Sequence, residues 1–484
     1  MTTQRGNGSW VVVPDPRVTE TALTCFVLSR SADVAAHAAV RRGRAWLRMA
    51  VPQSHHPVAL AVESWLRATA LHGRADSGHG TATEAWSARV RLLRIVALRA
   101  DGGEGVPGSW RILLAEIERA CGEARTARLK PWSHVELLAG RAMVNWRLAA
   151  HDKARENVLA VVEHQAPDGS CYGNPISTAL AFAAFDAIAP GTEPWRRALR
   201  WLLDGQHQDG TWRFCSSDVW DTTLTMRAFR GVPLFDTKCG SSAAGFLLDA
   251  QNSDGGWPFA SAVESDNDTT AAAVLALTGG GAANGGVPRA LVYLAERQTS
   301  DGLWRTWQFR DDPPAEDVVA HVVTALLDHG VGHAVSLTAA VRWLVERRND
   351  GGRWTASWYR GLPYATLEVG SALRDLPVVV AAAAGDLAAT QNDDGGWPAE
   401  RGEASTPSNT GLALAMMLRG KAMDERRWQS ALGYLLGTHR GDGTWPGRPE
   451  MYGPRPLLTH FPTHTQAFTV LGLRAARTYR AMVG

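Results

Sequence analysis

A seven-residue pattern, Gln-x-x-Asp-Gly-x-Trp, recurs along the chain and constrains its fold more than any other feature. Clear copies stand at residues 206–212, 251–257, 298–304 and 391–397, and degenerate copies stand at 348–354 and 438–445. The tryptophans that close the copies recur roughly every 45 residues, a period long enough for two helices and their turns. The pattern therefore predicts a chain built from helical hairpins.

Each part of the pattern has a structural reason. Several copies follow an apolar helix, such as 243–250, which runs into the glutamine. The Asp-Gly or Gly-Gly pair supplies a turn because glycine tolerates a positive φ, and the tryptophan can stack back on the preceding helix. We expect these tryptophans to join helices and to take no part in chemistry.

Length and charge limit the domain count and the kind of partner. At 484 residues the chain exceeds what one core usually supports, so we expect two domains. The net charge of +2 comes without a block of basic residues, which disfavours nucleic acid and favours a small molecule as the partner. The oligomeric state stays open, a homo-oligomer included.

The cysteines and the N-terminal residues indicate a compartment. The five cysteines are scattered singly, without the spacing of a zinc site. The polar start and the lack of an uninterrupted apolar run of about 20 residues disfavour a leader peptide and stable membrane insertion. We therefore expect the protein in the reducing cytoplasm.

The segment DNDTTA at 266–271 is the candidate for chemistry. It closes an acidic, glycine-rich turn and opens the apolar helix 271–277. A carboxylic acid at such a helix start, walled by aromatic rings, is what the protonation of an unactivated alkene requires. The same residues also suit a plain N-cap, because their oxygens satisfy the free amides of the first helical turn.

Three motifs in succession carry a family resemblance. SDVWDTTL at 217–224, DGGWPF at 254–259 and DNDTTAAAVLAL at 266–277 are similar, in order and spacing, to the class II terpene cyclases, which include squalene-hopene cyclase and the labdane-type diphosphate cyclases. The resemblance covers nearly the whole chain. It implies an all-α fold of two α/α barrels, in which residues 1–35 and 216–484 form the catalytic barrel and 36–215 form an inserted barrel.

The resemblance also implies roles around the acid. Asp268 matches the proton donor of the family's DxDD motif, and Asp266 would orient it. Thr269 replaces the last acid of that motif, and its hydroxyl can still hydrogen-bond a neighbour. His321, in PPAEDVVAHVVTAL, aligns with the histidine that contacts the catalytic acid. The alternative for His321 is a core histidine bonded to Asp317 one helical turn away.

Aromatic side chains are expected to stabilise the carbocation that protonation creates. Trp220, Trp358 and Tyr364 match cavity aromatics of the family. Each such face is worth about 0.5 to 2 kcal/mol through cation–π attraction. Packing is the alternative role for any one of them.

A second set of residues matches the diphosphate-binding parts of the family. DGSCYGNPISTA at 168–179 resembles a string of the copalyl-diphosphate-type cyclases, and Lys130 and Glu63 fall where that family binds diphosphate and holds Mg²⁺. Arg213 and Lys238 flank the expected domain junction and are further candidate ligands. Cationic donors and Mg²⁺ suit a diphosphate. A solvated surface position is the alternative for each of these residues.

The DxDTT variant is most similar to bacterial drimenyl-diphosphate synthases. This implies that farnesyl diphosphate is cyclised to a bicyclic drimane-type diphosphate with the diphosphate retained; geranylgeranyl diphosphate, giving a copalyl-type or halimadienyl-type product, is the alternative. Two other classes of protein are alternatives. A protein-prenyltransferase β-subunit needs Asp, Cys and His on zinc, and no cysteine follows the repeats in a suitable helix. A helical-repeat scaffold would lack the acid, its histidine and the diphosphate segments.

Overall fold

The computed structural model describes residues 4–51, 57–72, 110–115, 117–119, 131–261, 263–278, 285–306, 313–331, 337–453 and 457–483. Within these ranges the regular secondary structure is helical, apart from two short antiparallel strands, β1 (Met451–Tyr452) and β2 (Leu458–Thr459). The predicted all-α class is confirmed. Among the described helices, none combines the length and the apolar character that a bilayer crossing needs.

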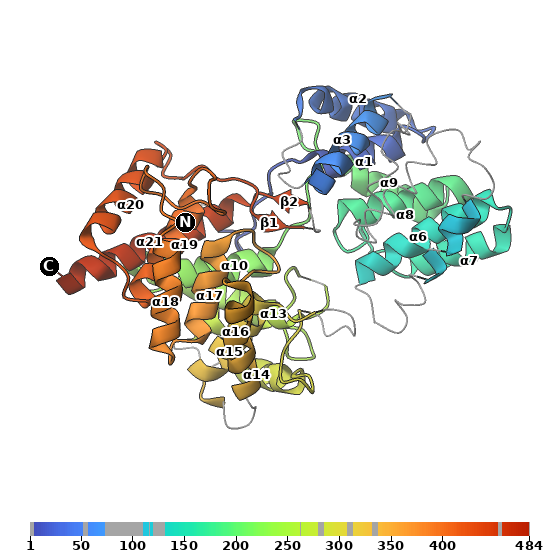
Figure 1. Cartoon of the computed structure of the whole chain (residues 1–484). Coiled ribbons are helices and arrows are strands. Elements are labelled where there is room, and N and C mark those ends of the chain that lie inside the picture. Colours follow the sequence, from blue (N-terminus) through green and yellow to red (C-terminus); the bar gives the residue numbers. More distant parts are fainter. Residues whose placement is uncertain are drawn as a thin grey trace.

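The helices fall into two groups, each around its own hydrophobic core (Figure 1). The N-terminal group contains α1 (Val18–Leu28), α2 (Val34–Met49), α3 (Pro57–His72), α6 (Pro131–Arg147), α7 (His151–Val162), α8 (Pro175–Ile188) and α9 (Glu193–Asp204). The second group, which we call the C-terminal barrel, contains α10 (Asp218–Phe229), α11 (Pro233–Phe235), the π-helical turn η4 (Asp236–Gly240), α12 (Ser241–Asp249), α13 (Asn267–Leu277), α14 (Gly286–Glu296), α15 (Glu316–Asp328), α16 (Thr338–Gly351), α17 (Leu362–Ala372), α18 (Pro377–Ala388), α19 (Pro407–Arg419), α20 (Glu425–Thr438) and α21 (Pro462–Val483).

The C-terminal barrel is a closed double ring. Helices α10, α13, α15, α17, α19 and α21 each contact the next, and α21 returns to contact α10. Helices α12, α14, α16, α18 and α20 pack outside this inner ring. The inner helix α13 is buried along its whole length, whereas the outer helix α20 buries only Ala431 and Leu435. Inner helices are therefore enclosed on all sides, while outer helices have one apolar face.

Helix α1 differs from the sequence-based expectation, which assigned residues 1–35 to the catalytic barrel. Its contacts are with α2, α3 and α8, inside the N-terminal group. Every residue of α1 is buried, so the helix needs neighbours all round it, and α3 and α8 provide them. The segment before α1 reaches the C-terminal barrel, where the ring centroids of Trp10 and Phe235 lie 5.7 Å apart in a stacked arrangement. The change of core falls between Trp212 and Val219, and the boundary expected near 215 stays a prediction.

The repeat tryptophans have the structural role expected of them. The indole N–H of each donates a hydrogen bond to the main-chain carbonyl of the leucine ten residues earlier, in the preceding helix. The pairs are Trp212 with Leu202, Trp257 with Leu247, Trp304 with Leu294, Trp354 with Leu344, Trp397 with Leu387 and Trp445 with Leu435. Each repeat therefore fastens its turn to the helix that precedes it.

The glutamine and glycine of the repeat connect neighbouring outer helices. The Gln251 amide donates to the carbonyl of Gly255 at 2.7 Å and to that of Gly286, at the start of α14, at 2.8 Å. Gly255 has a φ of +88°, and a Cβ there would lie 2.9 Å from the Arg289 carbonyl oxygen. Glycine is therefore required both for the turn and for the close approach of α14.

The same repeat positions the acidic segment. The Trp257 amide donates to the Thr270 hydroxyl at 2.8 Å, and the Asp266 amide donates to the Trp257 carbonyl at 3.1 Å. These bonds fix the start of α13 against the repeat turn. The chemistry-bearing residues of DNDTTA are thus placed at one end of the inner ring by the repeat that precedes them.

Candidate active site

Asp266 caps α13, and Asp268 lies in the first turn of that helix. The Asp266 carboxylate accepts from the Thr269 amide at 2.6 Å and from the Thr269 hydroxyl at 2.9 Å. The Thr269 hydroxyl thus hydrogen-bonds Asp266, in agreement with the expectation that it can bond a neighbouring side chain. Within the described part of the chain, no hydrogen bond joins Asp266 to Asp268, so Asp266 holds the helix start instead of contacting the candidate acid.

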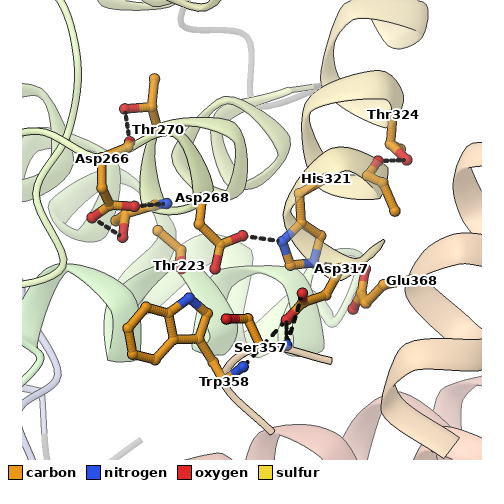
Figure 2. Close-up of polar contacts among 12 residues, drawn as sticks. Thr223, Asp266, Asp268, Thr270, Asp317, His321, Thr324, Ser357, Trp358 and Glu368 are labelled. Atoms are coloured by element: carbon orange, nitrogen blue, oxygen red, sulfur yellow. Dashed lines mark hydrogen bonds and ion pairs between the residues drawn. The ribbon is translucent and has the colours of Figure 1, made fainter. Parts of the chain in front are cut away.

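Asp268 begins a buried chain of charged groups. Its Oδ1 lies 2.6 Å from Nδ1 of His321, whose Nε2 lies 3.1 Å from Oε2 of Glu368. Glu368 in turn forms an ion pair with Arg227 at 2.9 Å. Figure 2 shows the His321 ring between Asp268 and Glu368. The four residues come from α13, α15, α17 and α10, so the inner ring assembles them.

Asp317 is not the hydrogen-bond partner of His321. Its two carboxylate oxygens each accept from the Ser357 amide at 2.9 Å (Figure 2). Asp317 thereby holds the loop before α17 against α15. The structure pairs His321 with Asp268, which is the arrangement that the family resemblance implied.

Electrostatics keep His321 positively charged. Burial disfavours the imidazolium, but the carboxylates of Glu368 and Asp268 outweigh it and raise the pKa of His321 to about 10. Burial likewise opposes ionisation of Glu368, but Arg227 and His321 hold its pKa below the ordinary value. At neutral pH an imidazolium therefore lies beside the Asp268 carboxyl group. A positive charge in that position stabilises the conjugate base that forms when Asp268 gives up a proton.

Two nearby carboxyl groups, unlike that of Glu368, have raised pKa values. Burial, together with the charge of Asp268, raises the pKa of Asp266 well above its ordinary value and the pKa of Asp317 to about 7. In both groups the shift makes the neutral form more accessible than in water, which lowers the negative charge gathered around the candidate acid.

Aromatic rings surround His321. The centroid of Trp220 lies 6.2 Å from that of the imidazole, and the centroid of Tyr364 lies 6.3 Å from it. Tyr359 packs on Tyr364 at 4.3 Å. The main chain of Trp358 lies beside Asp317, its amide donating to the carboxylate at 3.4 Å (Figure 2). Trp220 and Tyr364 are buried, whereas Trp358 is partly exposed.

The candidate diphosphate residues are not gathered at one place. Lys130 lies outside the described residues. Glu63 is buried on α3 and lines a cavity of about 70 Å³ together with Asp15, Arg17 and His460. This cavity is lined by both helical groups, because Glu63 belongs to the N-terminal group and His460 follows β2.

The two other candidate cations have different surroundings. Arg213 forms an ion pair with Asp209 at 2.5 Å and donates to the Pro14 carbonyl at 3.1 Å, next to Asp15 of the Glu63 cavity. Lys238 is exposed on η4, whose main contacts are with α11 and α12. Arg213 thus flanks the Glu63 cavity, and Lys238 does not line it.

The described side chains offer only part of a Mg²⁺ site. No group of three or more His, Cys, Asp or Glu that could hold a metal ion occurs among the residues with described positions. Mg²⁺ commonly takes one or two carboxylates together with substrate phosphates and waters. Glu63 could supply one carboxylate, but the described side chains do not form a complete site.

Sequence reasoning missed Glu368 and Arg227. Neither belongs to a recognised motif, and they are 141 positions apart, so only the closed ring brings them together. A weak signal was available, since each is a charged residue inside an otherwise apolar helix, in YATLEVGSAL and TLTMRAF. Charged residues are rarely buried unless they are paired, which would have justified a search for partners.

Known proteins are similar in sequence to parts of this chain. The model of the squalene-hopene cyclase C-terminal domain matches residues 176–312 and 308–478. A drimenyl diphosphate synthase from Streptomyces showdoensis is 30% identical over 195 residues, which cover 38% of this chain and 36% of that protein. An ent-copalyl diphosphate synthase from a Streptomyces species is 32% identical over 169 residues, which cover 33% of this chain and 31% of that protein. The matches thus span about a third of the length of these relatives.

One solved structure is similar over nearly the whole chain. The ent-copalyl diphosphate synthase from Streptomyces platensis superposes with a TM-score of 0.59 and 18% sequence identity, covering 97% of this chain and 96% of that one. At this identity the likeness concerns the fold alone. It agrees with a helical architecture that includes both the N-terminal group and the C-terminal barrel.

Proposed function

We propose that this chain, which belongs to the class II terpene cyclases of the squalene-hopene cyclase family, protonates the terminal alkene of a linear prenyl diphosphate. Ring closure follows, and the diphosphate stays on the product. The observation that carries this proposal is the buried contact of 2.6 Å between Asp268 and His321. An acid paired with an imidazole whose pKa is raised, among aromatic rings, suits alkene protonation better than it suits a structural role.

The geometry supports a defined course for the proton. The imidazolium of His321 donates its Nδ1–H to Oδ1 of Asp268, so the transferable proton is on the other carboxyl oxygen. As that proton moves to the alkene, negative charge develops on Asp268 beside a positive charge that is already in place. Preorganised charge of this kind lowers the barrier without any rearrangement during the reaction. Glu368 and Arg227 keep His321 charged and oriented.

The carbocation then needs stabilisation without a nucleophile. The faces of Trp220 and Tyr364 can each contribute about 0.5 to 2 kcal/mol by cation–π attraction. Their burial also excludes water, which would otherwise capture the cation. Trp358, which is less buried, is assigned to the same wall.

We assign farnesyl diphosphate as the substrate and a bicyclic drimane-type diphosphate as the product. Relatives named drimenyl diphosphate synthase from two organisms, 30% and 31% identical, support this choice. Geranylgeranyl diphosphate is the second candidate, because a relative named ent-copalyl diphosphate synthase has similar identity over a shorter match. We assign the activity to the cytoplasm.

Mutation of the acid tests the proposed chemistry. Asp268→Asn keeps the shape of the side chain and removes the transferable proton, so turnover should fall by at least roughly 10²-fold to 10⁴-fold, the contribution of a general acid. The matched control is Asp424→Asn, which changes the N-cap of the outer helix α20 and should leave turnover unchanged. A folded Asp268→Asn enzyme that cyclises farnesyl or geranylgeranyl diphosphate at the normal rate would remove Asp268 from the mechanism.

The diphosphate end is tested separately. If Glu63 and Mg²⁺ hold it together with Lys130, EDTA should suppress activity and added Mg²⁺ should restore it. Lys130→Ala should raise KM, because it removes binding that substrate and transition state share. The product should still contain its diphosphate. Release of free pyrophosphate in step with turnover would instead indicate ionisation chemistry and would contradict the class assignment.

A further inference from the structure

The proposed reaction needs a group that removes a proton as well as one that adds it. Isomerisation with the diphosphate retained leaves a carbocation that becomes neutral by losing a proton. Each ring closure moves the positive charge along the substrate, away from the carbon that Asp268 protonated. A proton acceptor is therefore needed at a second position in the barrel. This inference rests on the proposed function.

A second buried hydrogen-bonded chain lies next to the acid. The Trp220 indole N–H donates to the Tyr359 hydroxyl oxygen at 2.8 Å, and that hydroxyl lies 2.9 Å from Nδ1 of His464. Nε2 of His464 lies 2.7 Å from Oδ1 of Asp221. We call Tyr359, His464 and Asp221 the Tyr359 relay. They come from the loop before α17, from α21 and from α10.

The donors and acceptors fix the direction of the relay. Ser217 and the Val12 amide both donate to Asp221, at 3.1 Å and 3.4 Å, so its carboxylate acts as an acceptor. His464 consequently carries a proton on Nε2, and the neutral imidazole then has an acceptor at Nδ1. Because the indole of Trp220 can only donate, the Tyr359 hydroxyl accepts from Trp220 and donates to His464. The phenol oxygen thus retains one lone pair for another proton.

The relay and the acid share one aromatic wall. Trp220, which bonds Tyr359, also faces His321 at 6.2 Å, and Tyr364 contacts Tyr359 at 4.3 Å and His321 at 6.3 Å. Asp221 and Tyr359 are 0% and 3% exposed, so the relay is screened from bulk water. Tyr359 also contributes to the lining of a cavity of about 480 Å³, together with Ser357 and Glu316.

From this arrangement we propose that Tyr359 accepts the proton that ends the cyclisation, with His464 and Asp221 as its positioning residues. A C–H bond next to the cationic carbon breaks, its electron pair forms the C=C bond, and the proton moves to the phenol oxygen. The original phenol proton moves at the same time to Nδ1 of His464. The resulting imidazolium is stabilised by Asp221 through the Nε2–H. No oxidant or other reactant is needed.

A structural role makes different predictions. The relay also bridges α10 and α21, the helices at which the inner ring closes, so its bonds could serve only to close the barrel. In that case, substitutions would lower the melting temperature while leaving kcat and the product unchanged. The test must therefore measure product identity in addition to activity.

The experiment compares Tyr359→Phe, His464→Gln and the double variant with wild type on farnesyl diphosphate. We expect Tyr359→Phe to lower kcat by about 10²-fold with little change in KM. Its remaining product should shift towards an alcohol formed by water capture or towards an alkene isomer. The double variant should be no slower than the slower single variant, because the effects on kcat of substituting residues that act as a unit are not additive. Tyr293→Phe, a buried tyrosine on the outer helix α14, is the matched control and should behave as wild type.

The outcomes separate the two proposals. If wild type converts substrate and Tyr359→Phe gives the same product at the same kcat, the relay proposal is overturned and the proposed function stands. If wild type converts no prenyl diphosphate, the proposed function itself fails. Should Tyr359→Phe not fold, Asp221→Asn serves in its place. It should shift the product in the same direction, and an unchanged product would overturn the relay.

Discussion

At the scale of single residues, the site depends on the charge of His321. An imidazole in water is only partly protonated near neutral pH, but Glu368 and Asp268 raise the pKa of His321 to about 10 despite its burial. Arg227 keeps Glu368 ionised. The charge on His321 therefore depends on Arg227, a residue of α10 that forms no described hydrogen bond or ion pair with His321 or Asp268. The acid is thus tuned by residues up to three contacts away.

This charge gives a prediction for His321→Ala. The pKa of His321 in the folded protein lies above its ordinary value of 6.5, so the stability it contributes is fully present below about pH 6.5. That stability is lost as the pH rises through about 10. The free energy of unfolding of wild type should therefore exceed that of His321→Ala most at low pH, and the difference should shrink above neutrality. Denaturant unfolding across this pH range measures it.

The same variant should lower kcat at neutral pH by about 10²-fold, as removal of one preorganised donor does, with KM nearly unchanged. The control is His329→Ala. Nε2 of His329 lies 2.9 Å from the Thr278 hydroxyl oxygen. Like His321, His329 therefore connects α15 to α13, but at the opposite end of these helices from Asp268. A His321→Ala enzyme that loses stability yet keeps its kcat would show that His321 only packs the core.

At the scale of helices and turns, the sequence predicts most of what the structure contains. The repeat predicted hairpins, and the indole and glutamine bonds at Trp257 and Gln251 explain why the pattern is needed. Asp268 and His321 could be predicted because each lies in a recognisable motif. Glu368 could not, because its significance arises from partners on α15 and α10. The packing of α1 was predicted wrongly, because an apolar helix shows that it will be buried but not in which core.

The repeat glycine gives a prediction about stability. Gly395 has a φ of +87°, and a Cβ there would lie 2.3 Å from the Ser430 carbonyl oxygen on α20. Gly395→Ala should therefore destabilise the barrel by about 1 to 3 kcal/mol. Gly433→Ala is the control on α20, because its Cβ would meet open space and alanine favours the helix by about 0.5 to 1 kcal/mol. Equal effects of the two variants in urea unfolding would contradict the role given to the repeat turn.

At the scale of the whole molecule, the two helical groups contribute differently to the proposed reaction. The C-terminal barrel contains the acid, its charged partners, the aromatic wall and the Tyr359 relay. The N-terminal group supplies Glu63, whose cavity it shares with residues that follow the strands. The sequence could predict two groups of helices from length and repeat distribution. Closure of the ring was expected only from the family resemblance, because the contact between α10 and α21 joins segments more than 200 residues apart.

The most direct test of the central claim is turnover in D₂O with the product analysed by mass spectrometry. Protonation by Asp268, whose acidic hydrogen exchanges with solvent, predicts a cyclic diphosphate that carries one deuterium added at the former terminal alkene. The diphosphate should remain attached, and no pyrophosphate should accumulate. A product without solvent deuterium, formed together with an equivalent of pyrophosphate, would contradict protonation-initiated cyclisation by this barrel.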